Sequence, residues 1–248
     1  MTYCVGLLLE EGMVMLADTR TNAGLDNIST FAKLHVFHNP GERMIAVMTA
    51  GNLAVSQSVL NLVQEGLPDP EAEKASRETI RSVPSMFHAA ALVGEAVRHV
   101  HKVHGEAMRK QDVRFDVSVL VGGQIGNEPL RLFHVYAAGN FIEATRDTPF
   151  LQVGEHKYGK PILDRAVRPD MPLADAVKLV LISMDSTLRS NLSVGLPLDL
   201  LVYRRNQLDH AHVRRIGEHD PYFQMIRERW STALREAHRA IPAPEWGF

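Results

Sequence analysis

The chain has 248 residues, of which 45% are apolar and 23% charged, so it can bury one sizeable core, and we expect one domain over residues 1–248. Its 27 lysines and arginines nearly balance 29 aspartates and glutamates, which argues against nucleic acid or an anionic membrane as a partner. No apolar run approaches the ~18 residues of a membrane span. The single cysteine, Cys4, excludes an internal disulfide and favours a cytoplasmic protein.

The first eighteen residues predict a β-hairpin. Residues 3–9 and 13–17 are apolar runs, and Glu10-Glu11-Gly12 supplies the turn between them. Paired residues in such a hairpin have numbers that sum to about 20–22. Thr2 is therefore expected opposite residues 18–20, with the carboxylate of Asp18 nearby.

A second hairpin is predicted from residues 34–38 and 44–49, around the turn sequence NPGE at residues 39–42. Its paired residues have numbers that sum to about 81–83, which places Lys33 opposite residues 48–50. The Ala50-Gly51 step follows, and a helical pattern starts near Asn52. The open ends of the two hairpins thus gather a threonine, an acid, a lysine and a turn whose free amides could bind an oxyanion.

The rest of the chain alternates between helical and strand patterns. Pro68-Asp69-Pro70 ends the first helix, and the polar stretch that follows predicts a surface connection up to Pro84. Glycine turns are expected at Gly122-Gly123, Gly126-Asn127 and Gly139-Asn140. The predicted helices are 52–67, 86–108, 158–167, 173–188 and 221–241, and the predicted strands are 115–123, 129–139, 140–145, 150–153, 198–203 and 210–216. Strands that come in hairpin groups favour two stacked antiparallel sheets between helical layers over a parallel βαβ sheet.

Several segments resemble a known family. Thr2, Asp18-Thr19-Arg20, Lys33 and Thr49-Ala50-Gly51 resemble the start of a proteasome β subunit or its bacterial relative HslV, which are N-terminal nucleophile hydrolases. The similarity to Anbu, a family of bacterial proteasome-type peptidases, extends over nearly the whole chain, in the runs ADTRTNAG, NISTFAKLH, TAGNLAVSQ, GEHKYGKPILDR and SMDSTLRSNLSVGLPLDLLVYRR. The resemblance implies an α+β fold, the four-layer αββα sandwich of two antiparallel sheets.

The resemblance also implies the roles of site residues. Thr2, after removal of Met1, would be the nucleophile, Asp18 and Lys33 its charge partners, and Ala50-Gly51 the oxyanion site. Two supporting positions are implied near the terminal amine. Ser193 falls where proteasome β subunits keep a serine, and Ser190 falls where they keep an aspartate. Gly154-Glu155-His156 replaces their Gly-Ser-Gly run.

The implied activity is that of a threonine-type endopeptidase with no cofactor, acting on peptides or unfolded proteins inside a homo-oligomeric ring or open ring. Any unfoldase partner is left unidentified by the sequence. Two alternatives stay open. One is an amidase that uses the same machinery on a small amide, and the other is a scaffold whose site has degenerated, which the changes at Ser190 and Glu155-His156 motivate.

Other reactive residues have structural interpretations. Cys4 is expected to be a small core residue rather than a rival nucleophile. The pairs His101 with His104 and His210 with His212 lack a cysteine or carboxylate at ligand spacing, so no metal site is predicted. Asp185 and Ser186 are expected to cap or brace a helix end. Arg20 is expected either to pair with a carboxylate near the site or to lie on the surface.

Overall fold

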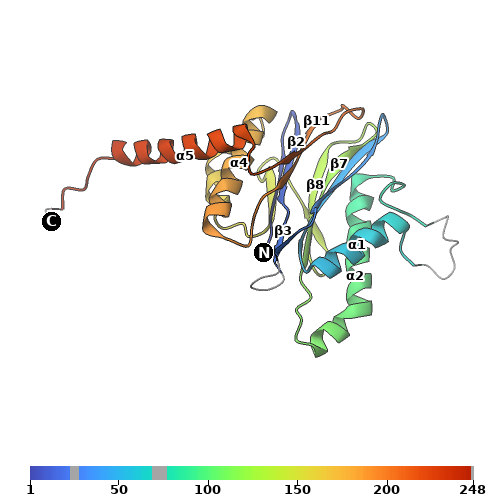
Figure 1. Cartoon of the computed structure of the whole chain (residues 1–248). Helices are drawn as coiled ribbons and strands as arrows, with labels where there is room; N and C mark the ends of the chain where they lie inside the picture. The colour runs from blue at the N-terminus through green and yellow to red at the C-terminus, as the bar shows by residue number, and fades with distance from the viewer. Residues whose placement is uncertain (23–27, 69–76, 247–248) are drawn as a thin grey trace.

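The computed structural model describes residues 1–22, 28–68 and 77–246, and these form four layers. Two five-stranded antiparallel sheets pack face to face, with α1 and α2 covering one sheet and α4 lying on the outer side of the other (Figure 1). The predicted αββα sandwich is therefore confirmed. Its layers follow from strands that are buried on both faces and helices that bury one face.

The first sheet contains the predicted N-terminal hairpin at its centre. Its order is β10-β1-β2-β11-β12, and Cys4 pairs with Ala17, within the predicted register. The strand β1 lies between β2 and β10, so both of its edges are paired. The strands are β1 Tyr3–Leu8, β2 Gly12–Asp18, β10 Phe150–Gly154, β11 Leu198–Arg204 and β12 His212–Ile216.

The second sheet has the order β5-β6-β7-β8-β9, and Leu34 pairs with Met48 as the second hairpin predicts. Its strands are β5 Leu34–Asn39, β6 Arg43–Gly51, β7 Val117–Ile125, β8 Arg131–Val135 and β9 Phe141–Glu143. A small ribbon of β3 Arg20–Asn22 and β4 Ile28–Thr30 joins the two hairpins, and the sequence did not predict it.

The prediction of a turn at Gly122-Gly123 is wrong. Both glycines lie inside β7, where Gly122 pairs with Ala46 and Gly123 with Ile45. A Cβ atom on Gly122 would lie 2.6 Å from the Sδ of Met13 in the facing sheet. These glycines therefore allow close approach of neighbouring groups within a strand rather than a change of chain direction.

Helices close the two outer faces. The helices α1 Leu53–Glu65 and α2 Met86–Lys110 pack on the second sheet, and α3 Lys160–Ala166 and α4 Leu173–Ser190 pack with the first. The helix α5 Pro221–Ala240 starts against α4 and then extends away from the body (Figure 1). Of the expected surface connection up to Pro84, residues 69–76 lie outside the described part of the chain.

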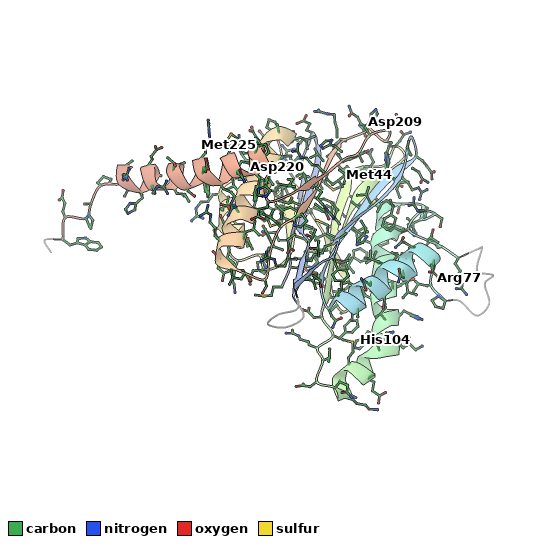
Figure 2. All side chains as sticks on the ribbon, in the orientation of Figure 1. Met44, Arg77, His104, Asp209, Asp220 and Met225 are labelled. Atoms are coloured by element: carbon green, nitrogen blue, oxygen red, sulfur yellow. The ribbon has the colours of Figure 1, made fainter. Side chains whose placement is uncertain are left out.

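The layer between the sheets is rich in methionine. Met13, Met15, Met44 and Met48 are fully buried there together with Cys4, and unbranched thioether side chains fill irregular space well. Figure 2 shows side chains crowded between the sheets and standing apart along α5. Within residues 1–22, 28–68 and 77–246, no helix is long and apolar enough to cross a membrane.

Candidate active site

Thr2 directly precedes β1 and is held against the end of β10. Its carbonyl oxygen accepts a hydrogen bond of 2.6 Å from the backbone N–H of Glu155, just after β10. Gly154 has φ +82°, and a Cβ atom there would lie 1.9 Å from that same oxygen, so only glycine fits. Thr2 is 9% exposed, and the position of its backbone is therefore fixed from the β10 side.

Asp18 and Lys33 form a buried ion pair beside the start of β1. The Lys33 ammonium donates to Asp18 Oδ1 at 2.7 Å and to the carbonyl oxygen of Arg20 at 2.6 Å. Asp18 Oδ1 also accepts from the Tyr3 N–H at 3.1 Å, and its Oδ2 accepts from the Gly195 N–H at 3.1 Å. The pair therefore connects the N-terminal hairpin to the second hairpin and to the loop before β11.

Burial raises the pKa of the Asp18 carboxyl above its ordinary value, while the Lys33 ammonium and the two amide donors act to lower it. All three neighbours of its oxygens donate hydrogen bonds. A protonated carboxyl would bring its own hydrogen into this set of donors, so the contacts favour the ionised form.

A pocket of about 640 Å³ opens in front of these groups. It brings Thr2 and Lys33 together with residues at the end of β6 and the start of α1, and with Glu155. Met1 lies at this pocket too, with 62% of its surface exposed. The lining residues are Met1, Thr2, Thr21, Lys33, Thr49, Ala50, Gly51, Asn52, Leu53, Ala54, Ser56, Asp116, Gly154 and Glu155.

Ala50 and Gly51, the predicted oxyanion turn, form part of one wall of the pocket. Ala50 and Gly51 end β6, and Asn52 caps α1 by accepting from the Val55 N–H at 3.2 Å. The Asn52 N–H donates to the carbonyl oxygen of Asp116 at 2.7 Å. The first turn of α1 contains no acidic residue, so the partial positive charge of the helix N-terminus adds to this wall of the pocket, which Asp116 also lines.

The two supporting serines have contacts other than Thr2. In the part of the chain that the structure describes, neither Ser190 nor Ser193 lines the pocket, and no hydrogen bond links either to Thr2. Ser190 is the last residue of α4, and the Ser193 N–H donates to Asn191 Oδ1 at 2.9 Å. Asn191, the residue after Ser190, donates to the Glu155 carboxylate at 2.9 Å.

Glu155 and Asn191 are the site-proximal residues that sequence reasoning missed. Glu155 was noticed only as a departure from the proteasome pattern. The available signal was an acidic residue directly after a glycine that ends a predicted strand. Asn191 gave no signal of its own, because its contact with Glu155 joins positions 36 residues apart.

The other reactive residues singled out in the sequence make structural contacts. Cys4 is fully buried, and burial raises the pKa of its thiol, so it does not supply a thiolate. Asp185 accepts from Arg189 and Arg227 and joins α4 to α5. Arg20 donates to the carbonyl oxygen of Leu192. No group of three or more potential metal ligands occurs among residues 1–22, 28–68 and 77–246.

Comparison with known proteins agrees with this architecture. The family model described as "Proteasome subunit" matches residues 2–196. "Proteasome subunit beta 2" of Pyrobaculum calidifontis is 27% identical over 210 residues, which cover 85% of this chain and 92% of that protein.

Solved structures are more similar still. "Anbu (ancestral beta-subunit) from Yersinia bercovieri" is 48% identical with a TM-score of 0.88, over 99% of this chain and 100% of that chain. "Helical Assembly of the Anbu Complex from Pseudomonas aeruginosa" is 48% identical with a TM-score of 0.90, over 99% of both chains. The chain therefore belongs to the proteasome subunit family and, within it, to the Anbu proteins.

Proposed function

We propose that this protein is a threonine-type peptidase in which Thr2, exposed by removal of Met1, is the nucleophile. The observation that carries the proposal is the shared pocket. Thr2, the ammonium of Lys33 and the Ala50-Gly51 turn line one cavity, and Asp18 holds the lysine from behind. A hydroxyl needs an adjacent base to attack at neutral pH, and a terminal threonine carries one in its own α-amine.

The proposed reaction begins when the Thr2 hydroxyl oxygen attacks the carbonyl carbon of a peptide bond and its proton passes to the α-amine. That amine has an unperturbed pKa of ~7.7–8.0, which suits a base at neutral pH. The proton then moves to the leaving nitrogen as the C–N bond breaks, which leaves an ester on Thr2. Water, activated by the same amine, hydrolyses the ester and restores the hydroxyl.

Two groups are proposed to stabilise charge during this reaction. The Lys33 cation favours the anionic form of the nearby threonine oxygen. The N–H groups of Ala50 and Gly51 are proposed to bind the oxyanion, and the loss of one such donor typically costs ~2.7–4 kcal/mol of barrier.

Intact mass spectrometry tests the proposal. The purified chain is expected to lack Met1 and to gain one adduct from an epoxyketone that reacts with terminal threonine. Thr2→Ala should take no adduct, and the control Ser231→Ala should still take one, because Ser231 lies on α5 and outside the pocket lining. A chain that keeps Met1, or one with free Thr2 and no adduct, contradicts the proposal.

The site differs from the proteasome pattern at Ser190 and Glu155, and this difference favours a scaffold as the second candidate function. A degenerate site would leave Thr2 free but unreactive. Cleavage of an unfolded protein supports the peptidase, and turnover of small amides alone supports an amidase. The absence of both activities, with no inhibitor adduct, supports the scaffold.

We also propose that the chain works as a homo-oligomer in the cytoplasm. The Pseudomonas aeruginosa relative is described as a helical assembly, and an assembly would restrict access to the nucleophile. The single cysteine is compatible with a reducing compartment. Light scattering is expected to give a mass well above the 27.7 kDa of one chain, and a monomer at all concentrations would contradict the assembly.

A further inference from the structure

A buried carboxylate lies next to Thr2 and has no place in the reaction as described so far. Glu155 is 6% exposed and lines the same pocket as Thr2. Its backbone N–H donates to the Thr2 carbonyl oxygen at 2.6 Å, so the two residues are held in adjacent positions. A carboxylate removed from water is costly unless cations or hydrogen-bond donors surround it.

Asn191 orients this carboxylate. The Asn191 backbone N–H donates to the Thr187 carbonyl oxygen at 2.9 Å at the end of α4. Its Oδ1 accepts the Ser193 N–H at 2.9 Å, so its Nδ2 group is the one left to donate to Glu155 Oε2, also at 2.9 Å. These two hydrogen bonds therefore fix the orientation of the Asn191 side-chain amide.

The same amide group also contacts the residue that precedes Thr2. Asn191 Nδ2 lies 3.9 Å from the Sδ of Met1. The Met1 side chain and the Glu155 carboxylate thus share one donor and lie side by side. Lys157 is a cation beside Glu155, but its ammonium is 3.5 Å from Oε1 and its side chain is 66% exposed, which makes it a weak partner.

We propose that Glu155, oriented by Asn191, binds the α-ammonium of Thr2 once Met1 has been removed. Asn191 Nδ2 contacts Met1, and Thr2 is the next residue along the chain. Removal of Met1 therefore creates the ammonium close to Asn191 and to the Glu155 carboxylate, which is incompletely paired. Glu155 then positions the amine beside the threonine hydroxyl and stabilises its protonated form, while Lys33 favours the neutral form. The inference rests on the proposed removal of Met1 but does not require peptidase activity.

The proposal gives a direction that can be measured. A carboxylate beside an amine raises the pKa of that amine, so Glu155→Gln should lower it by about one unit, a tenfold change in the free-amine fraction at a given pH. The other charged groups on the surrounding elements stay in place in the variant. They are Lys33 before β5 and Asp116 before β7, which line the pocket, Asp18 on β2, which pairs with Lys33, and His156 and Lys157 after β10.

The experiment begins with intact mass, which establishes that Met1 is absent. Reductive methylation with ¹³C-formaldehyde then labels the α-amine, and its NMR signal is titrated in wild type, Glu155→Gln and Glu155→Asp. The midpoint should fall in Glu155→Gln and stay closer to wild type in Glu155→Asp, which keeps the charge. The control Glu106→Gln removes an exposed carboxylate paired with Lys110 on α2 and should leave the midpoint unchanged.

Asn191→Ala is the second variant, for use if Glu155→Gln does not fold, and it should give a smaller fall in the same direction. An unchanged midpoint in the folded variants overturns the inference, and so does retention of Met1. If the midpoint of the α-amine titration shifts but no epoxyketone adduct forms, the proposed peptidase activity is rejected and the inference about Glu155 is retained. Where hydrolysis is measurable, the acid limb of the pH profile of kcat/KM should move to lower pH in Glu155→Gln.

Discussion

The ion pair between Asp18 and Lys33 is the residue-scale feature on which the site depends. Asp18 is fully buried and Lys33 is 4% exposed, and each also bonds to backbone groups from other segments. Burial makes such a pair costly to break on one side only, because the remaining charge has no water around it. Mutations here should therefore affect folding as well as any reaction.

Lys33→Met should lower the free energy of unfolding by about 3–5 kcal/mol, because it leaves the Asp18 charge buried without its cation. The double variant Lys33→Met with Asp18→Asn should be less destabilised than Lys33→Met alone, since the unpaired charge is removed. Urea denaturation measures both values. Lys110→Met, which breaks an exposed pair with Glu106, is the control and should cost no more than ~1 kcal/mol.

Tyr3 should make the protein less stable at high pH. Burial raises the pKa of Tyr3 to about 12 from an ordinary value of 10.0, while its hydroxyl lies 2.7 Å from Ser183 Oγ. Between these two values the unfolded chain loses the phenolic proton and the folded chain keeps it. The contribution to stability is thus complete below pH ~10 and is lost as pH rises towards ~12, at up to ~1.4 kcal/mol per pH unit.

Tyr3→Phe tests this pH dependence. The variant has no phenolic proton to lose, so its unfolding free energy should fall less steeply between pH 10 and 11 than that of wild type. Urea titrations at pH 8, 10 and 11 give the comparison. Equal slopes for the two proteins would show that the Tyr3 hydroxyl titrates alike in the folded and unfolded chains.

Sequence reasoning placed some of the site residues and missed others for a physical reason. Thr2, Asp18 and Lys33 lie at the open ends of local hairpins, so counting along two strands is enough to bring them together. Glu155 and Asn191 meet only because β10 pairs with β1 and α4 ends above that pair. Neither event has a local signature in the sequence.

Strand β7 is an element that local sequence patterns predicted wrongly. Two consecutive glycines usually mark a turn, yet Gly122 and Gly123 continue the strand because neighbouring groups approach too closely for side chains. The groups that crowd the two positions differ. A Cβ on Gly122 would meet the flexible Met13 side chain at 2.6 Å, whereas one on Gly123 would meet the Met44 carbonyl oxygen at 2.1 Å.

Gly123→Ala should therefore be more destabilising than Gly122→Ala. The Met13 side chain can change rotamer at a cost of about 1–3 kcal/mol, whereas the backbone of β6 cannot move without breaking its pairing with β7. Thermal and urea unfolding of the two variants measure the order. A larger loss in Gly122→Ala would mean that contact between the sheets is tighter than contact within the sheet.

Asp185 controls how α5 is attached. Its carboxylate is buried and bonds to Arg189 on α4 at 2.9 Å and to Arg227 on α5 at 2.8 Å. Asp185→Ala should lose about 1–3 kcal/mol of stability, with the largest gain of hydrogen exchange in residues 221–240. Asp175→Ala, which breaks a half-exposed pair with Lys178, should leave the exchange of α5 unchanged.

For the whole molecule, the sequence predicted the layers but not the order of strands. Hairpin groups separated by helix pairs favour two sheets between helices, and the αββα sandwich agrees with that. The neighbours β1 with β10 and β2 with β11 join segments more than 130 residues apart along the chain. Such pairs depend on the packing of the methionine-rich layer and both helical faces, which no local pattern encodes.

The two ends of the described chain have opposite surroundings, and this matters for how the protein is handled in the laboratory. Met1 lies at the pocket, whereas the chain beyond α5 extends away from the body (Figure 1). A purification tag or fluorescent fusion ahead of Thr2 would crowd the pocket and keep the threonine nitrogen inside an amide. We expect such a fusion not to react with the epoxyketone, whereas a fusion after residue 248 should react. A preparation that shows no reaction should therefore first be checked for which end carries the tag.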